Sequence, residues 1–457
     1  MSDLLLSRRL ARHALDGAAE RLPRPLEDWM RLLLLDHQAV AAAAEALGST
    51  VAARGSVTTT TGSTSDRPAG LVGGGFAAVE DAAFVNGVAA HGLDLDDTYE
   101  AASLHAGTVV FPAALAVAEA ESRSTAQLLA ASAVGYDVTC ALGVLLGAKE
   151  SYARGFHPTA VAGAVGAAAA VAVLLGLDED RTVHALGLAA TTAAGSLEFL
   201  SDGSWTKRLN AGHAAASAVR AAKLARAGFT APATALEGRD GFLRLYGDGL
   251  VPGRTLQLGA VGRGALDTSV KFYPCCRYMH GAIDLLRQVH DEHPDLPVTD
   301  VDVVEVAVIK AGAGLVADPP ARKLVIATTV DAQFSMPFGA AVALATGTAT
   351  VAQFADAPAV ARDLAPWLEK VRCVTSPRLE AAFPASWQAE VVVRLRDGSV
   401  LSRSEEAFQG SPGDRATLDQ VQDKAAGLLG PELAARLADH VVRVDGDQPW
   451  AGWQPGQ

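Results

Sequence analysis

Acidic and imidazole side chains are concentrated in one short stretch of the sequence. Asp94, Asp96 and Asp97 lie within four residues, directly after an apolar segment, and Thr98 and His105 follow. Carboxylates at the C-terminal end of a helix oppose its dipole, so these acids need compensating partners. Three interpretations follow: caps that accept backbone N–H groups in a turn, one wall of an active site, or oxygen ligands of a hard cation.

Two other segments carry groups that bind anions. His157 precedes Pro158 at the start of a long apolar segment. A helix N-terminus at this place would keep the imidazole neutral and would attract carboxylates. Lys207 and Arg208 form a cationic pair, which suits a carboxylate clamp in an acidic chain. A capping histidine and solvated loop charges are the alternative interpretations of these two segments.

The segment from Lys271 to His280 combines cationic, phenolic, thiol and imidazole groups within ten residues. It lies where the sequence changes from a helical to a mixed pattern, and clefts form preferentially at domain junctions. Cys276 would act as a nucleophile only if Arg277 or His280 lowered the pKa of its thiol. Because nothing indicates an acyl substrate, we do not expect a nucleophilic cysteine here.

Most of the chain has the periodicity of α-helices. Half of the residues are hydrophobic but only 5% are aromatic, so the apolar side chains are mainly Ala, Val and Leu, which suit closely packed helices. Residues 80–95 have helical spacing. The apolar segment 159–177 predicts a buried core helix, because it lacks the charged and aromatic flanks of a membrane span. We expect one discontinuous all-helical domain of residues 1–266 and 405–457, in which the C-terminal tail packs back onto the first helices.

A smaller α/β lid domain is predicted for residues 267–404. Four segments have the alternation or the β-branched content of strands: 301–309, 371–375, 391–395 and 400–403. The last two flank Asp397-Gly398, which predicts a type I′ hairpin. The predicted fold class is therefore mainly α, with a large all-helical domain and a smaller α/β domain.

Charge and cysteine content narrow the classes of function. The net charge of −13 at neutral pH argues against a nucleic-acid-binding face. The four cysteines have neither C-x-x-C nor zinc-finger spacing. A chain of 457 residues needs no disulfide scaffold, so we expect the cysteines to be reduced and the protein to lie in a reducing compartment. The segment 1–12 contains no apolar region of the length that a signal peptide needs. We therefore expect a cytoplasmic protein that binds neither nucleic acid nor membranes.

An ordered set of segments spans nearly the whole chain: Phe84 to His91, Asp94 to Thr98, His105, Gly155 to Thr159, Trp205 to Lys207, Gly212 to Ala214, Lys271 to His280, Val330 to Ser335 and Gly410 to Pro412. This set resembles the MmgE/PrpD family, which includes 2-methylcitrate dehydratase, cis-aconitate decarboxylase and iminodisuccinate epimerase. The resemblance implies a large helical domain, a smaller α/β lid and a homodimer. It also implies an active site between the domains, with no iron–sulfur cluster, no metal and no other cofactor.

The resemblance also assigns roles to individual residues. Those that match the active-site positions of the family are Asp94, Thr98, His105, His157, Lys207 and Lys271. Their neighbours that we expect to bind substrate are Arg208, Cys276, Arg277, Tyr278 and His280. Two features depart from the decarboxylase pattern, because Cys276 occupies the place of a histidine and Met336-Pro337 lies near the place of a tyrosine. These departures argue against a cis-aconitate decarboxylase.

The chemistry implied is removal of a proton next to a carboxylate. The resulting enediolate-like anion needs cations in a water-poor cleft, and we expect Lys207, Lys271 and Arg277 to provide them. A neutral His105 or His157 would be the base.

These roles predict a cofactor-independent lyase, a 2-methylcitrate dehydratase-like hydro-lyase acting on a small di- or tricarboxylate. An epimerase or isomerase of an imino- or amino-dicarboxylate needs nearly the same residues. A non-catalytic helical binding protein is the third hypothesis.

Overall fold

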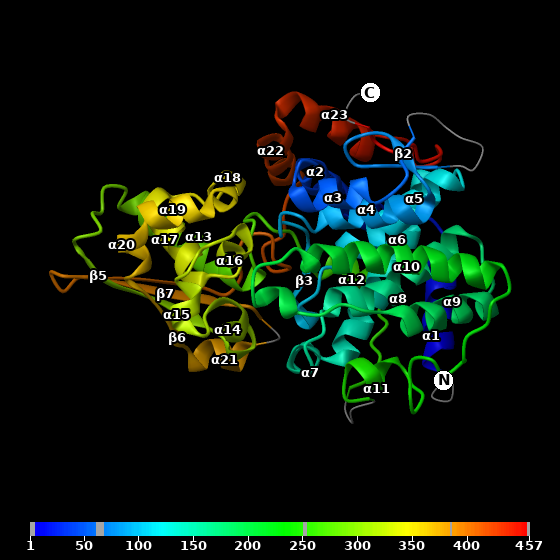
Figure 1. Cartoon of the computed structure of the whole chain (residues 1–457), viewed down its shortest axis with the longest axis horizontal. Helices are drawn as coiled ribbons and strands as arrows, with labels where there is room; N and C mark the ends of the chain where they lie inside the picture. The colour runs from blue at the N-terminus through cyan, green and yellow to red at the C-terminus, as the bar shows by residue number, and fades with distance from the viewer. Residues whose placement is uncertain (1–4, 61–67, 250–253, 384–385, 455–457) are drawn as a thin grey trace.

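The computed structural model describes residues 5–60, 68–249, 254–383 and 386–454. Two groups of elements lie side by side: a larger helical part that contains both ends of the chain, and a smaller part built around a β-sheet (Figure 1). This arrangement confirms the predicted fold class, which is mainly α with a smaller α/β region.

The larger part is a bundle of helices that surround a buried central helix, α8. Up to residue 266 its helices are α1 (Leu6–Gly17), α2 (Arg24–Ala43), α3 (Gly48–Gly55), α4 (Val79–Ala90), α5 (Gly107–Ala120), α6 (Thr125–Leu146), α7 (Ala148–Ala153), α8 (Pro158–Leu174), α9 (Glu179–Thr192), α10 (Thr206–Arg226), α11 (Phe242–Tyr246) and α12 (Arg263–Leu266). Helix α8 packs against α5, α6, α9 and α10, and almost all of its residues are buried. The prediction of a buried core helix in this segment is therefore confirmed.

Helix α6 is the one helix of the described residues that is long and apolar enough to cross a membrane. However, 94% of its most apolar window is buried inside the fold. Its N-terminus is capped by Ser124, whose side chain accepts from the backbone N–H of Gln127. The burial shows that α6 packs as a core helix in this structure.

The C-terminal tail returns to the helical part, as predicted. Helices α22 (Leu418–Leu429) and α23 (Pro431–Val442) pack against α2, and Leu437 and Val441 lie in the helical core. The ammonium group of Lys424 in α22 lies 2.5 Å from the carboxylate of Asp36 in α2. It also donates to the carbonyl of Lys271 at 2.6 Å. The tail thus fixes backbone that lies next to the cavity described below.

The smaller part is organised by a four-stranded sheet with the strand order β6-β5-β7-β8. The strands are β5 (Val301–Val308), β6 (Val371–Thr375), β7 (Ala389–Leu395) and β8 (Val400–Glu405). Strand β6 is parallel to β5, whereas β7 is antiparallel to both β5 and β8. All four predicted strands are confirmed, but the turn between β7 and β8 is not type I′. Of its two central residues only Gly398 has a positive φ, and type I′ needs two.

Short helices cover this sheet and carry the remaining residues of the smaller part. They are α13 (His280–Glu292), α14 (Lys310–Val316), α15 (Pro320–Lys323), α16 (Thr329–Gln333), α17 (Met336–Thr346), α18 (Val351–Ala355), α19 (Ala357–Asp363), α20 (Ala365–Leu368) and α21 (Pro377–Ala382). Two further ladders, β1 (Ala69–Gly70) with β2 (Phe76–Ala77) and β3 (Thr98–Tyr99) with β4 (Thr268–Ser269), lie outside the main sheet. Because β3 and β4 pair, the segment after Asp97 lies beside the start of the segment that leads to Lys271.

The two parts have separate hydrophobic cores. The first core draws on helices before residue 270 and on the tail after residue 416. The second draws on residues 273–393 together with Phe199. These cores support our proposal that the domain limits lie near residues 267 and 404.

Two helix boundaries differ from the predicted ones. Helix α4 ends at Ala90 rather than near residue 95, so the acidic residues that follow lie in irregular backbone, and Asp94 has a left-handed φ of 53°. Helix α10 begins at Thr206, so Lys207 and Arg208 lie in its first turn rather than in a loop. Both differences arise because buried side-chain partners, described below, outweigh local propensity.

Candidate active site

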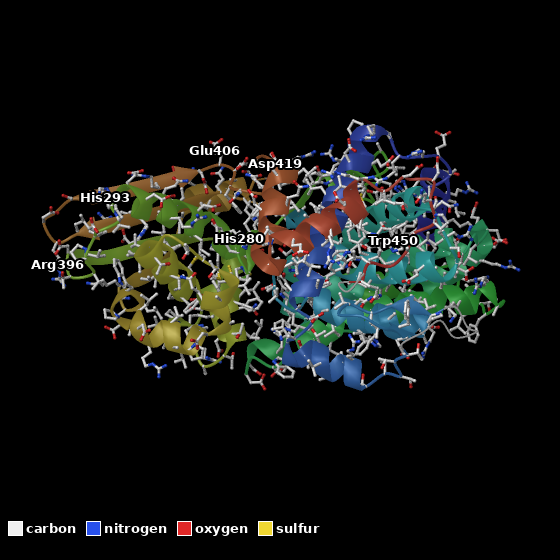
Figure 2. All side chains as sticks on the ribbon, turned by 90° about the horizontal axis from the view of Figure 1, so that it is seen from above. His280, His293, Arg396, Glu406, Asp419 and Trp450 are labelled. Atoms are coloured by element: carbon white, nitrogen blue, oxygen red, sulfur yellow. The ribbon has the colours of Figure 1, made fainter. Side chains whose placement is uncertain are left out.

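A cavity of about 490 Å³, including its open mouth, lies where the two parts of the fold meet. Figure 2 shows His280 at this junction, whereas Arg396 lies at the far end of the smaller part. The predicted site residues that line the cavity from the helical part are Asp94, Thr98, His105, His157 and Lys207. Those from the smaller part are Cys276, Arg277 and Tyr278.

Asp94 holds two lysines beside the cavity. Its Oδ1 accepts from the ammonium group of Lys207 at 2.5 Å and from that of Lys271 at 3.0 Å. Lys271 does not line the cavity but is fully buried behind Asp94, whose carbonyl also accepts from it at 2.7 Å. Burial favours the neutral acid, but the two ammonium groups outweigh it and hold the pKa of Asp94 well below its ordinary value. Of the two ammonium groups only that of Lys207 reaches the cavity, where it can also bind an anionic ligand.

Two other predicted substrate contacts turn away from the cavity. The guanidinium group of Arg208 donates to the hydroxyl of Ser49 at 3.0 Å. Consecutive helical residues point about 100° apart, so Arg208 and Lys207 do not face the same side of α10. His280 is buried behind the wall, where its Nε2 lies 3.3 Å from the carbonyl of Cys275. Direct contact of Arg208 or His280 with a ligand in this cavity is therefore not supported.

His105 presents an unprotonated nitrogen. Its Nδ1 lies 2.7 Å from the carbonyl oxygen of Asp97 and 3.3 Å from the hydroxyl of Thr98. A carbonyl only accepts hydrogen bonds, so Nδ1 carries the ring proton and Nε2 keeps its lone pair. Burial lowers the pKa of His105 well below its ordinary value, although the nearby carboxylate of Asp96 opposes this. The ring is therefore neutral at physiological pH and can accept a proton.

His157 has the opposite tautomer because of Asn210. The side-chain amide of Asn210 donates to the carbonyl of Ser196 at 3.0 Å, which identifies its nitrogen end. The same nitrogen lies 3.5 Å from Nδ1 of His157. Nδ1 therefore accepts, and the ring proton lies on Nε2. Burial lowers the pKa of His157 well below its ordinary value, and its side chain makes no bond that caps α8.

Arg277 is the cation that the smaller part contributes. Its Nε donates to Glu100 at 3.0 Å, and its Nη1 donates to the carbonyl of Gln409 at 3.2 Å. The guanidinium carbon lies 4.4 Å from the ring centre of Phe408. The buried Nη2 has no hydrogen-bond partner in the described part of the chain. A bound carboxylate would satisfy this donor.

Cys276 lines the cavity as a neutral thiol. Burial raises its pKa above the ordinary value, and the carboxylate of Asp94 acts in the same direction. A thiol with a raised pKa is a poor nucleophile at neutral pH. The side chain thus contributes a small apolar surface, in agreement with the expectation that it does not attack a substrate.

Each of the three clustered acids has a different partner. Asp94 binds the two lysines, whereas Asp97 accepts from the hydroxyl of Tyr136 and from the backbone N–H of Gly107 at 3.0 Å, at the start of α5. Burial and the neighbouring Asp96 raise the pKa of Asp97 to about 7, although its hydrogen bonds oppose the shift. The capping interpretation therefore describes Asp97, and the active-site interpretation describes Asp94.

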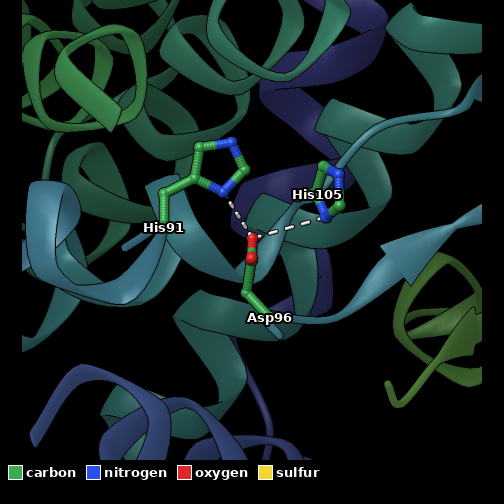
Figure 3. Close-up of side chains that lie close together, drawn as sticks. All are labelled: His91, Asp96 and His105. Carbon is green, nitrogen blue, oxygen red and sulfur yellow. Dashed lines mark hydrogen bonds and ion pairs between the residues drawn. The ribbon is translucent and has the colours of Figure 1, made fainter. Parts of the chain in front are cut away.

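Asp96 lies between two imidazoles (Figure 3). Its Oδ2 lies 2.8 Å from Nδ1 of His91 and 3.3 Å from Nδ1 of His105. These three side chains are spaced closely enough to hold a metal ion. A metal would need unprotonated nitrogens, but the carbonyl of Asp97 requires a proton on Nδ1 of His105. The positive charges of Lys207 and Lys271, which act on both rings, would also repel a cation. The donor set fits a hydrogen-bonded triad better than a metal centre.

Comparison with known families accounts for both parts of the fold. Residues 8–253 match the MmgE/PrpD N-terminal domain, and residues 273–445 match the MmgE/PrpD C-terminal domain. The chain belongs to the MmgE/PrpD family. The N-terminal match contains Asp94, His105 and Lys207, and the C-terminal match contains Arg277. The cavity of this MmgE/PrpD protein is thus built from both family domains.

Several curated members of the MmgE/PrpD family are similar to this chain. A cis-aconitate decarboxylase-like protein, oryM, of Aspergillus oryzae is 28% identical over 80% of this chain and 79% of its own length. The cis-aconitate decarboxylase of Mus musculus is 27% identical over 79% of this chain and 74% of its own length. That of Homo sapiens is 38% identical over a shorter stretch, 36% of this chain and 34% of its own length.

Sequence reasoning missed part of the cavity wall in this MmgE/PrpD member. The unpredicted lining residues include Ser103, Tyr152, Phe334 and Trp387. Ser103 has a left-handed φ of 48°, and its hydroxyl lies 2.8 Å from that of Tyr278. Its position two residues before His105 was the available signal for Ser103. The apolar Phe334 and Trp387 carry no chemical pattern that distinguishes them from core residues.

Proposed function

We propose that this chain is a cofactor-independent lyase, a 2-methylcitrate dehydratase-like hydro-lyase that acts on a small di- or tricarboxylate. One observation carries the proposal. The neutral His105, with its unprotonated Nε2, lines the same cavity as Lys207, which is held by Asp94. A base and a buried cation on one cavity are what removal of a proton next to a carboxylate requires.

The substrate carboxylates would bind from both sides of the cavity. Lys207 belongs to the helical part and Arg277 to the smaller part, so each can anchor one carboxylate. The pair favours a substrate with two carboxylates, because each cation can form a further charge-assisted hydrogen bond beside the one to Asp94 or Glu100. Tyr278 and Ser103, which lie 2.8 Å apart at their hydroxyls, supply further hydrogen-bond partners.

The proposed elimination conserves protons and electrons. Nε2 of His105 takes the proton on the carbon next to the carboxylate, and the C–H electron pair becomes the new double bond. The negative charge that develops on the carboxylate lies against Lys207. The departing hydroxyl accepts a hydrogen bond from Nε2 of His157 and takes the proton that His105 acquired, so that water leaves and both rings return to their starting states.

Epimerisation of an imino- or amino-dicarboxylate is the second candidate, and one observation favours it. His105 and His157 have opposite tautomers on one cavity. One ring could remove a proton from one face of the carbon, and the other could return a proton to the opposite face. This reaction needs no leaving group, so its product has an inverted centre and no new double bond.

The names of the curated relatives support lyase chemistry on a carboxylate. They are cis-aconitate decarboxylases or decarboxylase-like. We favour a hydro-lyase over that reaction because Cys276 occupies the place of a histidine in the decarboxylase pattern. Met336, near the place of the tyrosine, is buried and is not part of the cavity wall. The binding-protein hypothesis is disfavoured because Asp94, His157 and Lys207 share one cavity.

Proton NMR in D2O tests the proposal. The purified protein is incubated with 2-methylcitrate, citrate and iminodisuccinate in separate samples. A new olefinic product, seen as a vinyl proton from citrate or as an allylic methyl singlet from 2-methylcitrate, supports the hydro-lyase. Deuterium at the α-carbon with inversion and no vinyl signal supports the epimerase instead. Neither signal with any of the compounds contradicts both reactions on these substrates.

We also propose a cytoplasmic homodimer. Four free cysteines suit a reducing compartment. Size-exclusion chromatography with light scattering tests the dimer, because a protomer of 46.9 kDa predicts a particle of twice that mass. A monomer at micromolar concentration would contradict it.

A further inference from the structure

Asp96 lies directly behind the proposed base and is shared by two rings. Its Oδ2 lies 2.8 Å from Nδ1 of His91 and 3.3 Å from Nδ1 of His105, as the dashed lines in Figure 3 show. Asp96 and His91 are both buried, with exposed fractions of 2% and 1%. Neither lines the cavity, so neither can contact a substrate there. Any effect of this pair on the reaction must therefore act through His105 or His157.

The geometry orients His91 and Asp96 toward the base. His91 stacks on His157, with ring centres 5.6 Å apart and planes inclined by 22°, and lies edge-on to His105 at 5.0 Å. It is thus placed between the two rings that line the cavity. Its Nε2 and the Oδ1 of Asp96 have no hydrogen-bond partner among the described residues. The hydrogen bond of Asp96 Oδ2 with Nδ1 of His91 holds these two buried side chains together and keeps the carboxylate 3.3 Å from Nδ1 of His105.

We propose that Asp96 is a positioning residue that stabilises the positive charge that the His105 ring gains during turnover. His91 is the second positioning residue, because its Nδ1–H fixes the carboxylate of Asp96. The inference rests on the proposed function in one respect, namely that His105 is the base. It adds two residues that the family resemblance does not assign.

The proton steps follow from the tautomer. In the resting enzyme Nδ1 of His105 donates to the carbonyl of Asp97 at 2.7 Å, and Oδ2 of Asp96 lies 3.3 Å from the same nitrogen without a hydrogen bond to it. When Nε2 takes a proton from the substrate, the ring becomes a cation whose nearest negative charge is Asp96. Asp97 contributes only a neutral carbonyl to this contact. The carboxylate of Asp96 therefore makes His105 a stronger base without touching the substrate.

Other charged groups surround the triad of His91, Asp96 and His105 and also influence the protonation of His105. The charged groups that act on the triad are Asp94, Lys207, Lys271, Asp97 and the pair of Asp36 with Lys424. The buried His37 also faces Asp96, and burial lowers its pKa to about 3. The lysines next to His105 oppose its protonation, whereas Asp96 favours it. Loss of the charge of Asp96 should therefore lower the pKa of His105.

Asp96→Asn tests the inference because it removes the charge but keeps an acceptor oxygen. The expected result is a fall in kcat of about 100-fold or more with KM changed by less than about threefold, as for a carboxylate that orients a catalytic histidine. The acidic limb of the pH profile of kcat/KM should move to lower pH, because His105 loses the charge that favours its protonated form. A kcat and a pH profile equal to those of the wild type would overturn the inference.

Asp137→Asn is the matched control. Asp137 is also a buried carboxylate bonded to a histidine, with Nε2 of His13 at 2.9 Å, and it does not line the cavity. It should leave the pH profile unchanged. An equal loss of kcat in both variants would mean that Asp96 acts only on folding.

A second readout does not depend on turnover. Long-range 1H–15N NMR of histidine-labelled protein identifies which nitrogen of His105 carries the proton. Assignment uses His91→Phe and His105→Gln. The wild type should have the proton on Nδ1, and Asp96→Asn should shift the Nδ1 signals of both His91 and His105. A proton on Nε2 of wild-type His105, or unshifted signals in the variant, would overturn the inference whatever the substrate proves to be.

His91→Phe provides a variant in case Asp96→Asn does not fold. It keeps an aromatic ring beside His157 but removes the N–H that fixes Asp96. We expect a fall in kcat of about tenfold with KM unchanged, and a shift of the His105 Nδ1 signal. Wild-type values for both would exclude a positioning role for His91.

Discussion

The two lysines that share Asp94 should have different roles, and replacing each with methionine tests this. Both ammonium groups bond Oδ1 of Asp94, at 2.5 Å for Lys207 and 3.0 Å for Lys271. Only Lys207 lines the cavity, and its side chain is 11% exposed whereas that of Lys271 is fully buried. Methionine keeps the length of the side chain and removes the charge. Lys207→Met should therefore reduce activity, and Lys271→Met should reduce stability.

The magnitudes follow from the contacts that each variant loses. Loss of a cation that faces the developing charge reduces kcat/KM by about 10²–10³-fold. In Lys207→Met the carboxylate of Asp94 keeps Lys271, so the free energy of unfolding should fall by only about 1 kcal/mol. In Lys271→Met a buried ion pair and a hydrogen bond to the carbonyl of Asp94 are lost. Because Lys207 still pairs with Asp94, the cost should lie near the lower end of the usual range, at about 3 kcal/mol.

Two assays separate the effects. Loss of substrate and formation of product, followed by proton NMR, give kcat/KM, and circular dichroism gives the midpoint of thermal unfolding. For a chain of 457 residues about 3 kcal/mol corresponds to a decrease of roughly 3 °C. Equal losses of stability in the two variants, or wild-type activity in Lys207→Met, would refute the reasoning that assigns catalysis to Lys207 and support to Lys271.

Three further outcomes are expected. Gly166→Ala should destabilise the helical core by about 1–3 kcal/mol, because a Cβ there would collide with Thr139 in α6. Gly427→Ala is the control: it has open space around it and should raise the unfolding midpoint slightly. Equal midpoints in the two variants would contradict the packing. The raised pKa of Asp97, about 7, means that the folded state holds a proton that the unfolded state releases near pH 4. The contribution of Asp97 to stability is therefore present at low pH and is lost as pH rises through 7. Between pH 5 and 8 the urea midpoint of Asp97→Asn should therefore depend less on pH than that of the wild type. Identical slopes would contradict this. Incubation with a chelator should leave turnover unchanged, whereas a loss that added metal ions restore would assign the triad to a metal.

The sequence predicted the cavity better than it predicted the orientation of single side chains. Asp94, His105, His157 and Lys207 are far apart in the chain yet line one cavity, as the family resemblance implied. Adjacent residues were less reliable, since helical geometry turns Arg208 away from Lys207. Adjacent side chains point about 100° apart in a helix and to opposite faces in a strand, so a charged pair in the sequence does not by itself predict a clamp.

Elements were predictable where one local signal dominated. Alternating valines identified β5, and the apolar segment after His157 identified α8. The end of α4 was mispredicted because the acids after it are stabilised by distant partners: Asp94 pairs with Lys207 and Lys271, more than a hundred residues away. Interactions between residues so far apart in the chain produce no periodic pattern in the sequence.

The central claim is that His105 removes a proton next to a substrate carboxylate, and exchange of that proton with solvent deuterium tests it most directly. The measurement compares wild-type protein with His105→Gln and with His13→Gln, whose ring bonds Asp137 away from the cavity. We predict exchange in the wild type and in His13→Gln, and a loss of at least about 100-fold in His105→Gln. Exchange at the wild-type rate in His105→Gln would contradict the account.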